Sequence, residues 1–449
     1  SSSRRCSVKK VQLAFVALIL ALLLVPGVGL VVSGPASAGA NEVPAQMPDL
    51  TERDGSLNTA YLSELADYVN DGFYARQELI TLWAQLLTPL GHSAEDDVIL
   101  GTDGWLYYAP EIEQWAGVET MTDREIFAAA YNLSLMQEYA AGLGVRFVFT
   151  IAPDKRSLYP EHLPGYPKAD APTDADRLAQ VLEELDVAYV DLFALFEAQD
   201  DVLYFEHDSH WNSRGAALAA DAINAALGVS SSYGAGYDYE TRQHTGDLFE
   251  MLYPAGADEE TNDEPTALNF NQGQNVRPDS ITIDTTGAGE LNLLMFRDSF
   301  GELLYPFMAE SSAAARFSRM AAYDLTLAEE LSSTAVVIEL VERNLSWLYE
   351  QPATYPAPER ELELTAAQNG TATATLDEAY EGAHRVSGTI SGEVDVASPV
   401  YIEYNGVVYA AGLTSDGYTA CLPGEGGGEY TVFWYSNGVL TGCDISANI

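Results

Sequence analysis

The sequence has few basic residues for its length. Its 449 residues include 21 Lys and Arg against 67 Asp and Glu, which gives a formal net charge of −46 at pH 7. Four of the cations precede Glu42, the first acidic residue, so the rest of the chain carries 17 basic against 67 acidic side chains. A surface of this charge repels phosphate backbones. We therefore exclude nucleic acid as a partner, although charge alone says little about the fold.

Cysteines and cofactor-binding motifs are also scarce. The three cysteines are Cys6, Cys421 and Cys443, and none of them has the spacing of a zinc site. Cys421 and Cys443 lie in one short C-terminal region, and they are candidates for a disulfide in an oxidising compartment. The sequence contains no Walker loop and no dinucleotide-binding fingerprint, so we expect no cofactor.

The N-terminal segment combines positive charge with a long apolar run. The basic residues 4–10, RRCSVKK, precede an uncharged stretch over 11–41, and its apolar part is long enough to cross a bilayer as a helix. We expect residues 1–41 to be a signal anchor or a cleaved signal peptide, for which Ala36-Ser37-Ala38 offers a cleavage site. Both alternatives leave the remainder of the protein outside the cytoplasm, anchored to the cell membrane or secreted.

The chain is then expected to continue as a stalk, a core domain and a second domain. Residues 42–95 contain a polar stalk followed by apolar residues at helical spacing, which predicts a helix or a pair broken near Asp71-Gly72. Residues 96–350 alternate short apolar runs with amphipathic stretches. This alternation predicts an α/β fold with a doubly wound parallel sheet.

Individual elements of the core can be placed by pattern. We expect a hairpin around the turn at Asp103-Gly104, and the other elements follow as two sets. The expected strands cover 145–152, 187–192, 203–206, 291–296 and 335–340, and the expected helices cover 123–143, 175–185, 213–227 and a stretch from 301. The polar connection over 228–284 is long for a compact domain, which predicts a lid or substrate wall.

The sequence pattern changes after Pro356. Short alternating segments joined by Asn-Gly and Gly-rich turns predict a small all-β sandwich over 357–449. Its aromatic residues would either stack on sugar rings, making this a carbohydrate-binding domain, or fill the sandwich core, and we favour the core. The residues concerned are Tyr404, Tyr409, Trp434 and Tyr435.

Reactive residues follow two of the expected strands. Ligands bind beyond the carboxyl ends of the strands in open α/β sheets. One strand leads to Ser299 on a strand-to-helix turn, where backbone N–H groups can stabilise an oxyanion. The other leads to Asp208 and His210, and His210 is the histidine placed to activate a serine, with Asp208 to orient it. These positions predict a Ser299, His210 and Asp208 triad.

Other interpretations of these residues remain open. Ser299 is also suited to cap a helix. His207, Asp208 and His210 would make a plausible set of metal ligands, although no further histidine motif or acidic pair supports a metal, and we favour the triad.

Four further residues are candidates for contacts with the substrate or the oxyanion. Lys155 directly follows a strand and would steady an anion or form a surface ion pair. Arg297 adjoins the nucleophile and would contact substrate or form an ion pair with Glu339 or Glu342. Gly301 begins the helix whose N–H groups face the oxyanion, and Asp247 is either a substrate contact or a turn residue in the expected lid.

Several blocks of sequence together resemble one family. They are DGFYAR (71–76), GTDGWLYY (101–108), PDKRSLYPEHLP (153–164), DSHWNSRGA (208–216), GDLFEML (246–252), RDSFGE (297–302) and VVIELVERNL (336–345). In this order they resemble the DHHW proteins and the related alginate O-acetyltransferases of the AlgX/AlgJ type, which carry a circularly permuted SGNH-hydrolase-like domain. By position, Asp208, His210 and Ser299 match the triad of that family.

The resemblance implies an activity, and the sequence departs from the family pattern at two positions. It implies O-acetylation of an extracellular polysaccharide through an acetyl-serine, with acetyl groups supplied by a membrane protein. The DHHW motif reads DSHW here, and Arg297 stands where ordinary SGNH enzymes have Gly, which leaves the second oxyanion donor unassigned. An esterase or deacetylase with the same triad, and a non-catalytic polysaccharide-binding or assembly scaffold, remain the alternatives.

Overall fold

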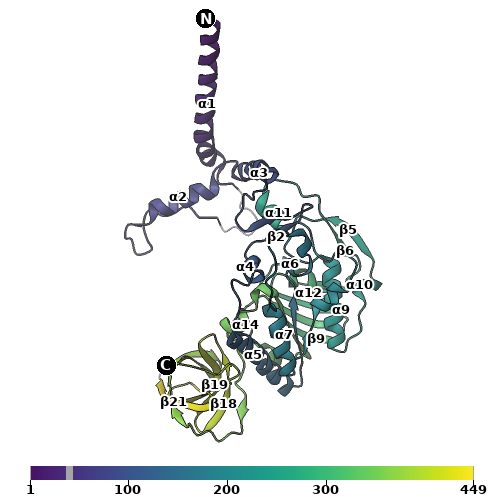
Figure 1. Cartoon of the computed structure of the whole chain (residues 1–449), viewed down its shortest axis with the longest axis vertical. Helices are drawn as coiled ribbons and strands as arrows, with labels where there is room; N and C mark the ends of the chain where they lie inside the picture. Colours follow the sequence, from purple (N-terminus) through teal and green to yellow (C-terminus); the bar gives the residue numbers. More distant parts are fainter. Residues whose placement is uncertain (1, 37–43, 448–449) are drawn as a thin grey trace. The chain divides into compact units, whose positions relative to one another are not determined.

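The computed structural model describes residues 2–36 and 44–447. Most of the expected cleavage site, Ser37-Ala38, and the expected boundary at residue 41 lie outside the described residues. Figure 1 traces the chain from the N-terminal helix to the C-terminal strands. The residues of the chain divide into two compact units. The first contains the residues up to Ala109 together with Glu206–Ser209 and Gln243–Thr261, and the second contains Pro110–Phe205, His210–Arg242 and the residues from Asn262 onward. The domain limits expected from composition remain predictions.

The first unit is mainly helical. Its elements are α1 (Ser2–Ser33), α2 (Tyr61–Gly72), α3 (Arg76–Leu87), a 3₁₀ turn at Thr88–Leu90, β1 (Val98–Leu100), β2 (Leu106–Tyr108) and α11 (Asp247–Leu252). The predicted break between two helices is confirmed, because Ala75 adopts φ 61° in the left-handed region between α2 and α3. The predicted hairpin is also confirmed, since β1 pairs antiparallel with β2.

Two features complete the first unit. The small core of this unit joins α3, the hairpin and α11 through five buried side chains: Ala84, Val98, Leu106, Leu248 and Leu252. Among the described residues, none of the helices has both the length and the apolar character of a membrane span.

The second unit contains a seven-stranded sheet in the order β4-β3-β11-β9-β10-β8-β7. The strands are β3 (Arg146–Ala152), β4 (Tyr189–Val190), β7 (Phe270–Gln272), β8 (Thr282–Gly287), β9 (Leu291–Phe296), β10 (Ser312–Ser318) and β11 (Ala335–Val341). Neighbours from β4 to β10 pair parallel, as predicted. In contrast, β8 pairs antiparallel with β10, and β7 pairs antiparallel with β8.

This antiparallel edge corrects the prediction that residues 228–284 form only a lid or wall. Part of that connection supplies β7 and the start of β8. The turn after β8 contains Gly289, where a Cβ atom would lie 2.1 Å from the carbonyl carbon of Ser311. A glycine here lets the chain reverse tightly before β9, so β8 runs against the parallel strands. The connection also carries α10 (Tyr233–Gly236) and the paired strands β5 (Tyr239–Gln243) and β6 (Thr261–Pro265).

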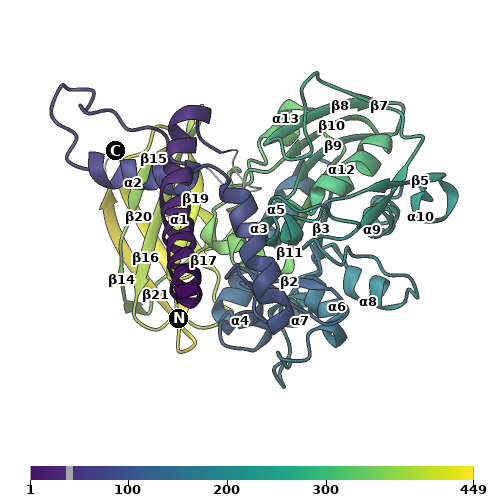
Figure 2. The ribbon, with the colours of Figure 1, turned by 90° about the horizontal axis from the view of Figure 1, so that it is seen from above.

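Helices cover both faces of the sheet (Figure 2). Along β3, Phe149 packs into a core with α5 (Asp123–Gly142) and α7 (Asp174–Glu184), whereas Val148 packs into a core with α9 (Ser213–Ala226) and α12 (Gly301–Glu310). This alternation follows from the two-residue period of strand side chains. The doubly wound prediction is therefore confirmed. The remaining short helices are α4 (Glu111–Trp115), α6 (Lys155–Leu158), α8 (Leu192–Glu197), α13 (Leu327–Glu330) and α14 (Trp347–Glu350), with 3₁₀ turns at Pro160–His162 and Glu342–Asn344.

The strand predicted over 203–206 is wrong. Within this segment Tyr204 forms only an isolated antiparallel bridge with Trp211, and the Phe205 N–H donates to the carbonyl of His210. The chain turns back over residues 207–209, and the backbone groups of 203–206 bond to the returning segment and to groups such as the Lys155 ammonium instead of joining the sheet.

The C-terminal region is all-β, as predicted. Its ladder has the order β13-β21-β20-β17-β18-β19-β16-β14, with β12 paired to β18 and β15 paired to β16. The strands are β12 (Glu359–Arg360), β13 (Gln368–Asn369), β14 (Thr371–Ala372), β15 (Thr375–Tyr380), β16 (Ala383–Ser391), β17 (Val400–Tyr404), β18 (Val407–Leu413), β19 (Gly417–Pro423), β20 (Gly428–Ser436) and β21 (Val439–Ala447). Asn405-Gly406 and Asn437-Gly438 have positive φ at both positions, as two-residue hairpin turns require.

Two predictions about side chains of this region can be checked. Tyr404, Tyr409 and Trp434 are buried, which confirms that they fill the core, whereas Tyr435 is exposed. The expected disulfide is wrong, because Cys421 and Cys443 are both free. Cys421 lies on β19 and Cys443 on β21, and β18, β17 and β20 separate these strands in the ladder.

Candidate functional site

Ser299 lies on the turn between β9 and α12. Strand β9 ends at Phe296 and α12 begins at Gly301, which confirms the predicted strand-to-helix turn. Ser299 is half-buried, whereas Arg297, Asp298 and Phe300 around it are buried. The hydroxyl-bearing residue is therefore the accessible part of an otherwise packed turn.

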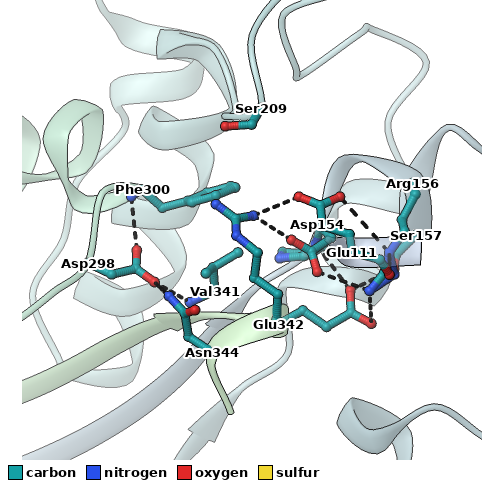
Figure 3. Close-up of polar contacts among 12 residues, drawn as sticks. Glu111, Asp154, Arg156, Ser157, Ser209, Asp298, Phe300, Val341, Glu342 and Asn344 are labelled. Atoms are coloured by element: carbon teal, nitrogen blue, oxygen red, sulfur yellow. Dashed lines mark hydrogen bonds and ion pairs between the residues drawn. The ribbon is translucent and has the colours of Figure 1, made fainter. Parts of the chain in front are cut away.

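Asp298 fixes the backbone of this turn (Figure 3). Its Oδ1 accepts the N–H of Phe300 at 2.9 Å, and its Oδ2 accepts the N–H of Val341 at 2.8 Å and the Asn344 amide at 3.1 Å. Val341 ends β11, so the carboxylate joins two neighbouring strand ends. Sequence reasoning missed Asp298 and Asn344, because their pairing joins residues far apart in the chain.

Gly301 and Arg297 pack against each other in the same turn. A Cβ atom at Gly301 would lie 2.5 Å from the Arg297 side chain, so the first residue of α12 has to be glycine for this packing. The role of the Gly301 N–H as an oxyanion donor remains a prediction.

Arg297 is only 3% exposed, and its side chain binds backbone carbonyl groups. Its guanidinium donates to the carbonyls of Pro278 and Ser280 at 2.6 and 3.2 Å, and burial lowers its pKa. Burial also raises the pKa of Glu339 well above its ordinary value, with the charge of Asp298 as the second cause. This favours a neutral Glu339, which is a poor ion-pair partner for Arg297.

His210 packs beside the nucleophile turn. Its ring centroid lies 4.7 Å from the ring centroid of Phe300, the residue that follows Ser299. The adjacent Trp211 donates its indole N–H to the Phe300 carbonyl at 3.0 Å. The structure therefore brings the loop of the predicted base to the turn of the predicted nucleophile, both within the second unit.

Asp208 belongs to the first unit, and its partners there were not predicted. Its Oδ2 lies 2.9 Å from Nε2 of His244 and accepts the N–H of Asp247 at 3.1 Å. Burial lowers the pKa of His244, but the hydrogen bond and charge of Asp208 outweigh it, and the pKa is raised. His244 lies in none of the sequence blocks that resemble the family, so the sequence did not predict a role for it.

Asp247 begins α11 and acts as a turn residue. It accepts both the N–H and the hydroxyl of Ser209, at 2.7 and 2.6 Å. It also accepts the N–H of Leu248 at 2.7 Å. These bonds are those of a turn residue, and a contact of Asp247 with the substrate remains a prediction.

His207 faces a different set of residues from Asp208. Its Nδ1 lies 2.7 Å from Asp258 Oδ1, and the ligand-type atoms of His207, Asp258 and Glu260 all lie within 4.8 Å of one another. Such a set is chemically able to bind a divalent cation. Backbone N–H groups already satisfy both carboxylates, since Gly246 and Glu260 donate to Asp258 and His207 donates to Glu260. These backbone hydrogen bonds already fix the position of the two carboxylates.

Lys155 is buried at the start of α6. The side chain is 1% exposed and its ammonium donates to the carbonyl of Phe205 at 3.2 Å. The expected alternative of a surface ion pair is therefore wrong, because Lys155 is buried in the first turn after β3. Lys155 supports the backbone that leads to His210, and its contact with an anion remains a prediction.

A buried ionic cluster lies beside the same loops (Figure 3). The carboxylate oxygens of Asp154 lie 2.6 Å from the Arg343 guanidinium and 3.1 Å from the Arg156 guanidinium. A carboxylate oxygen of Glu111 lies 2.9 Å from the Arg343 guanidinium. Burial and the charge of Asp154 raise the pKa of Glu111 to about 8. The Arg343 guanidinium also lies 5.3 Å from the centre of the Phe300 ring, so the cluster adjoins the residue after Ser299.

Comparison with known proteins confirms the resemblance drawn from the motifs. Residues 98–289 match the model of the SGNH hydrolase-like domain of acetyltransferase AlgX, a range that includes Asp208 and His210 and ends before Ser299. A probable alginate O-acetylase AlgJ of Pseudomonas syringae pv. tomato is 30% identical over 179 residues, covering 38% of this chain and 44% of the relative. AlgJ of Pseudomonas aeruginosa is 28% identical over 182 residues, covering 38% and 45%.

The chain spans about half the length of the curated relatives it matches. Among solved structures, a DHHW family protein from Eubacterium siraeum is 17% identical, with a TM-score of 0.43, and the match covers 57% of this chain and 96% of that one.

Proposed function

We propose that the chain is an O-acetyltransferase that carries an acetyl group on Ser299 and passes it to a hydroxyl group of a polysaccharide outside the cytoplasm. One observation carries the proposal: accessible Ser299 stands on a rigid strand-to-helix turn whose next residue, Phe300, packs against His210. The similarity to proteins named alginate O-acetylases supports acetyl transfer and a polysaccharide acceptor.

The two half-reactions use the same base. His210 takes the proton of the Ser299 hydroxyl as the serine oxygen attacks the acetyl carbonyl of the donor, and it returns that proton to the leaving group. In the second half-reaction His210 deprotonates a sugar hydroxyl, which attacks the acetyl-serine, and Ser299 recovers its proton. Asp208 orients the imidazole and stabilises its charged form.

The reaction also requires an acetyl donor and a location. The acetyl donor is an ester or thioester, delivered at the membrane by a second protein. Action outside the cytoplasm is supported by the basic residues 4–10 followed by an apolar run. An anchored and a secreted form both fit that order of residues.

The test follows the fate of an acetyl group. The protein would be incubated with p-nitrophenyl acetate, alone and with alginate oligosaccharides, and the products and the intact protein would be measured by mass spectrometry. We expect an acetyl adduct on Ser299 and its transfer to sugar, both lost in Ser299→Ala. Ser134→Ala, which removes a half-buried hydroxyl on α5, is the matched control.

Two other outcomes would replace the proposal. Ser299-dependent release of acetate, with no transfer to any sugar, would identify an esterase that uses water as acceptor. Equal behaviour of the wild type and Ser299→Ala would identify a scaffold without catalysis at this turn.

A further inference from the structure

Asp208 is held by a second histidine within the first unit. His244 Nε2 lies 2.9 Å from Asp208 Oδ2, and the N–H of Asp247 donates to the same oxygen at 3.1 Å. The Asp208 side chain is 8% exposed and that of His244 is 25% exposed. A charge-assisted hydrogen bond of this length in a largely buried place is a strong constraint on the carboxylate.

The backbone around His244 is fixed independently of that bond. Its N–H donates to the carbonyl of Glu260 at 2.9 Å, and the side chain of neighbouring Gln243 donates to the carbonyls of Asp258 and Glu260, both at 2.7 Å. These bonds hold the chain on both sides of the imidazole. His244 is therefore able to position Asp208, because its own place does not depend on Asp208.

The turn that follows packs directly on the Asp208 segment. A Cβ atom at Gly246 would lie 2.3 Å from the carbonyl oxygen of His207 and 2.9 Å from the backbone nitrogen of Asp208. Only glycine permits this approach. Residues 243–247 therefore form a clamp on Asp208, with His244 and the Asp247 N–H as its two donors, and we call it the 243–247 clamp.

Carboxylates dominate the surroundings of His244. Asp208 faces it from the segment 206–209, Asp247 from the start of α11 and Glu260 from the chain before β6. Burial lowers the pKa of His244, whereas the bond to Asp208 and the charges of Asp208, Glu260 and Asp247 raise it. The Asp208 hydrogen bond and these charges therefore hold the pKa of His244 above its ordinary value, at a position that touches the predicted catalytic acid.

We propose that His244 is a positioning residue of the acetyl-transfer site, which fixes the Asp208 carboxylate and shares its negative charge. This inference rests on the proposed function, in which Asp208 supports His210. A carboxylate that already binds an imidazolium stabilises a second imidazolium less strongly. His244 therefore keeps His210 more readily neutral, and so available as a base, at a lower pH.

The first test separates position from charge. His244→Gln keeps a neutral N–H donor, whereas His244→Ala removes the donor, and His92→Gln is the control at an exposed histidine. For His244→Ala we expect kcat to fall by about 10- to 100-fold with KM for the acetyl ester nearly unchanged. For His244→Gln we expect most of kcat at its optimum and an acid limb of kcat/KM moved to higher pH, as loss of a neighbouring positive charge requires.

The second test does not depend on activity. In histidine-labelled protein, NMR titration of His244 in the wild type and in Asp208→Asn gives its pKa directly. We expect the pKa of His244 to fall when the carboxylate is removed. An unchanged pKa would show that the two side chains are not coupled and would overturn the inference, even if a variant in the first test failed to fold.

The outcomes also distinguish this inference from the proposed function. Loss of acetyl transfer in Ser299→Ala, together with a pH profile and kcat unaffected by both His244 substitutions, would overturn the role of His244 alone. Full activity of Ser299→Ala would instead overturn the proposed function.

Discussion

The ring of Phe300 packs against both His210 and Arg343, since its centroid is 4.7 Å from the ring centroid of His210 and 5.3 Å from the Arg343 guanidinium. Its carbonyl also accepts the Trp211 indole N–H. Phe300 follows Ser299 directly, so one buried side chain couples the turn of the nucleophile to the loop of the base.

Phe300→Leu should therefore reduce activity more than stability. Loss of the ring removes the contact with His210 while retaining an apolar side chain, and we expect about tenfold lower kcat. The free energy of unfolding should fall by about 1–2 kcal/mol, as for other shape changes in a packed core. Phe307→Leu, in the helix α12 that follows the turn and buried to a similar degree, is the control. Equal loss of kcat in both variants would argue against a specific role of the Phe300 ring.

Asp298→Asn should destabilise the nucleophile turn. The amide replaces one accepting oxygen with a donor, so at least one of the N–H groups of Phe300 and Val341 loses its acceptor inside the protein. We expect a loss on the order of 2–3 kcal/mol in denaturant unfolding and slower acetylation of Ser299. Asp123→Asn breaks an exposed ion pair with Arg177 and should cost less than about 1 kcal/mol. A similar small loss for Asp298→Asn would show that Asp298 does not fix the backbone of the nucleophile turn.

Local patterns predicted much of the fold and part of the site. The turns at Asp103-Gly104 and Asn405-Gly406, the strand before Ser299 and the helix after it follow from residues close together in sequence. The antiparallel edge strands and the partners of Asp298 depend on long-range pairing, which no local pattern encodes. Residues 203–206 are apolar like a strand, yet they pack as a closed loop, because buried loops and strands share that composition.

The state of the two C-terminal cysteines is directly measurable. Without prior reduction, both Cys421 and Cys443 should react with N-ethylmaleimide after unfolding, and reductant should leave the thermal midpoint unchanged. In the folded protein Cys443 should react faster, because Cys421 is 3% exposed and burial raises the pKa of its thiol. Recovery of an unalkylated, disulfide-bonded pair by peptide mapping would contradict the free thiols.

The buried cluster at Glu111 should make stability depend on pH. Burial and the charge of Asp154 raise the pKa of Glu111 from its ordinary value of 4.5 to about 8, against the opposing charges of Arg343 and Arg156. Between these pH values the folded protein binds a proton that the unfolded chain releases, so this contribution is complete below pH 4.5 and is lost as the pH rises through 8.

The corresponding experiment compares Glu111→Gln with Glu113→Gln, which changes an exposed carboxylate on the same helix α4. Denaturant unfolding of the wild type and of Glu113→Gln should give a free energy that declines from about pH 5 to about pH 9. Glu111→Gln mimics the protonated acid, so its decline should be shallower over that range. Because the introduced amide keeps an oxygen for the Arg343 guanidinium, this variant should remain folded at neutral pH. Parallel curves for both variants would show that Glu111 does not carry the titrating proton of the cluster.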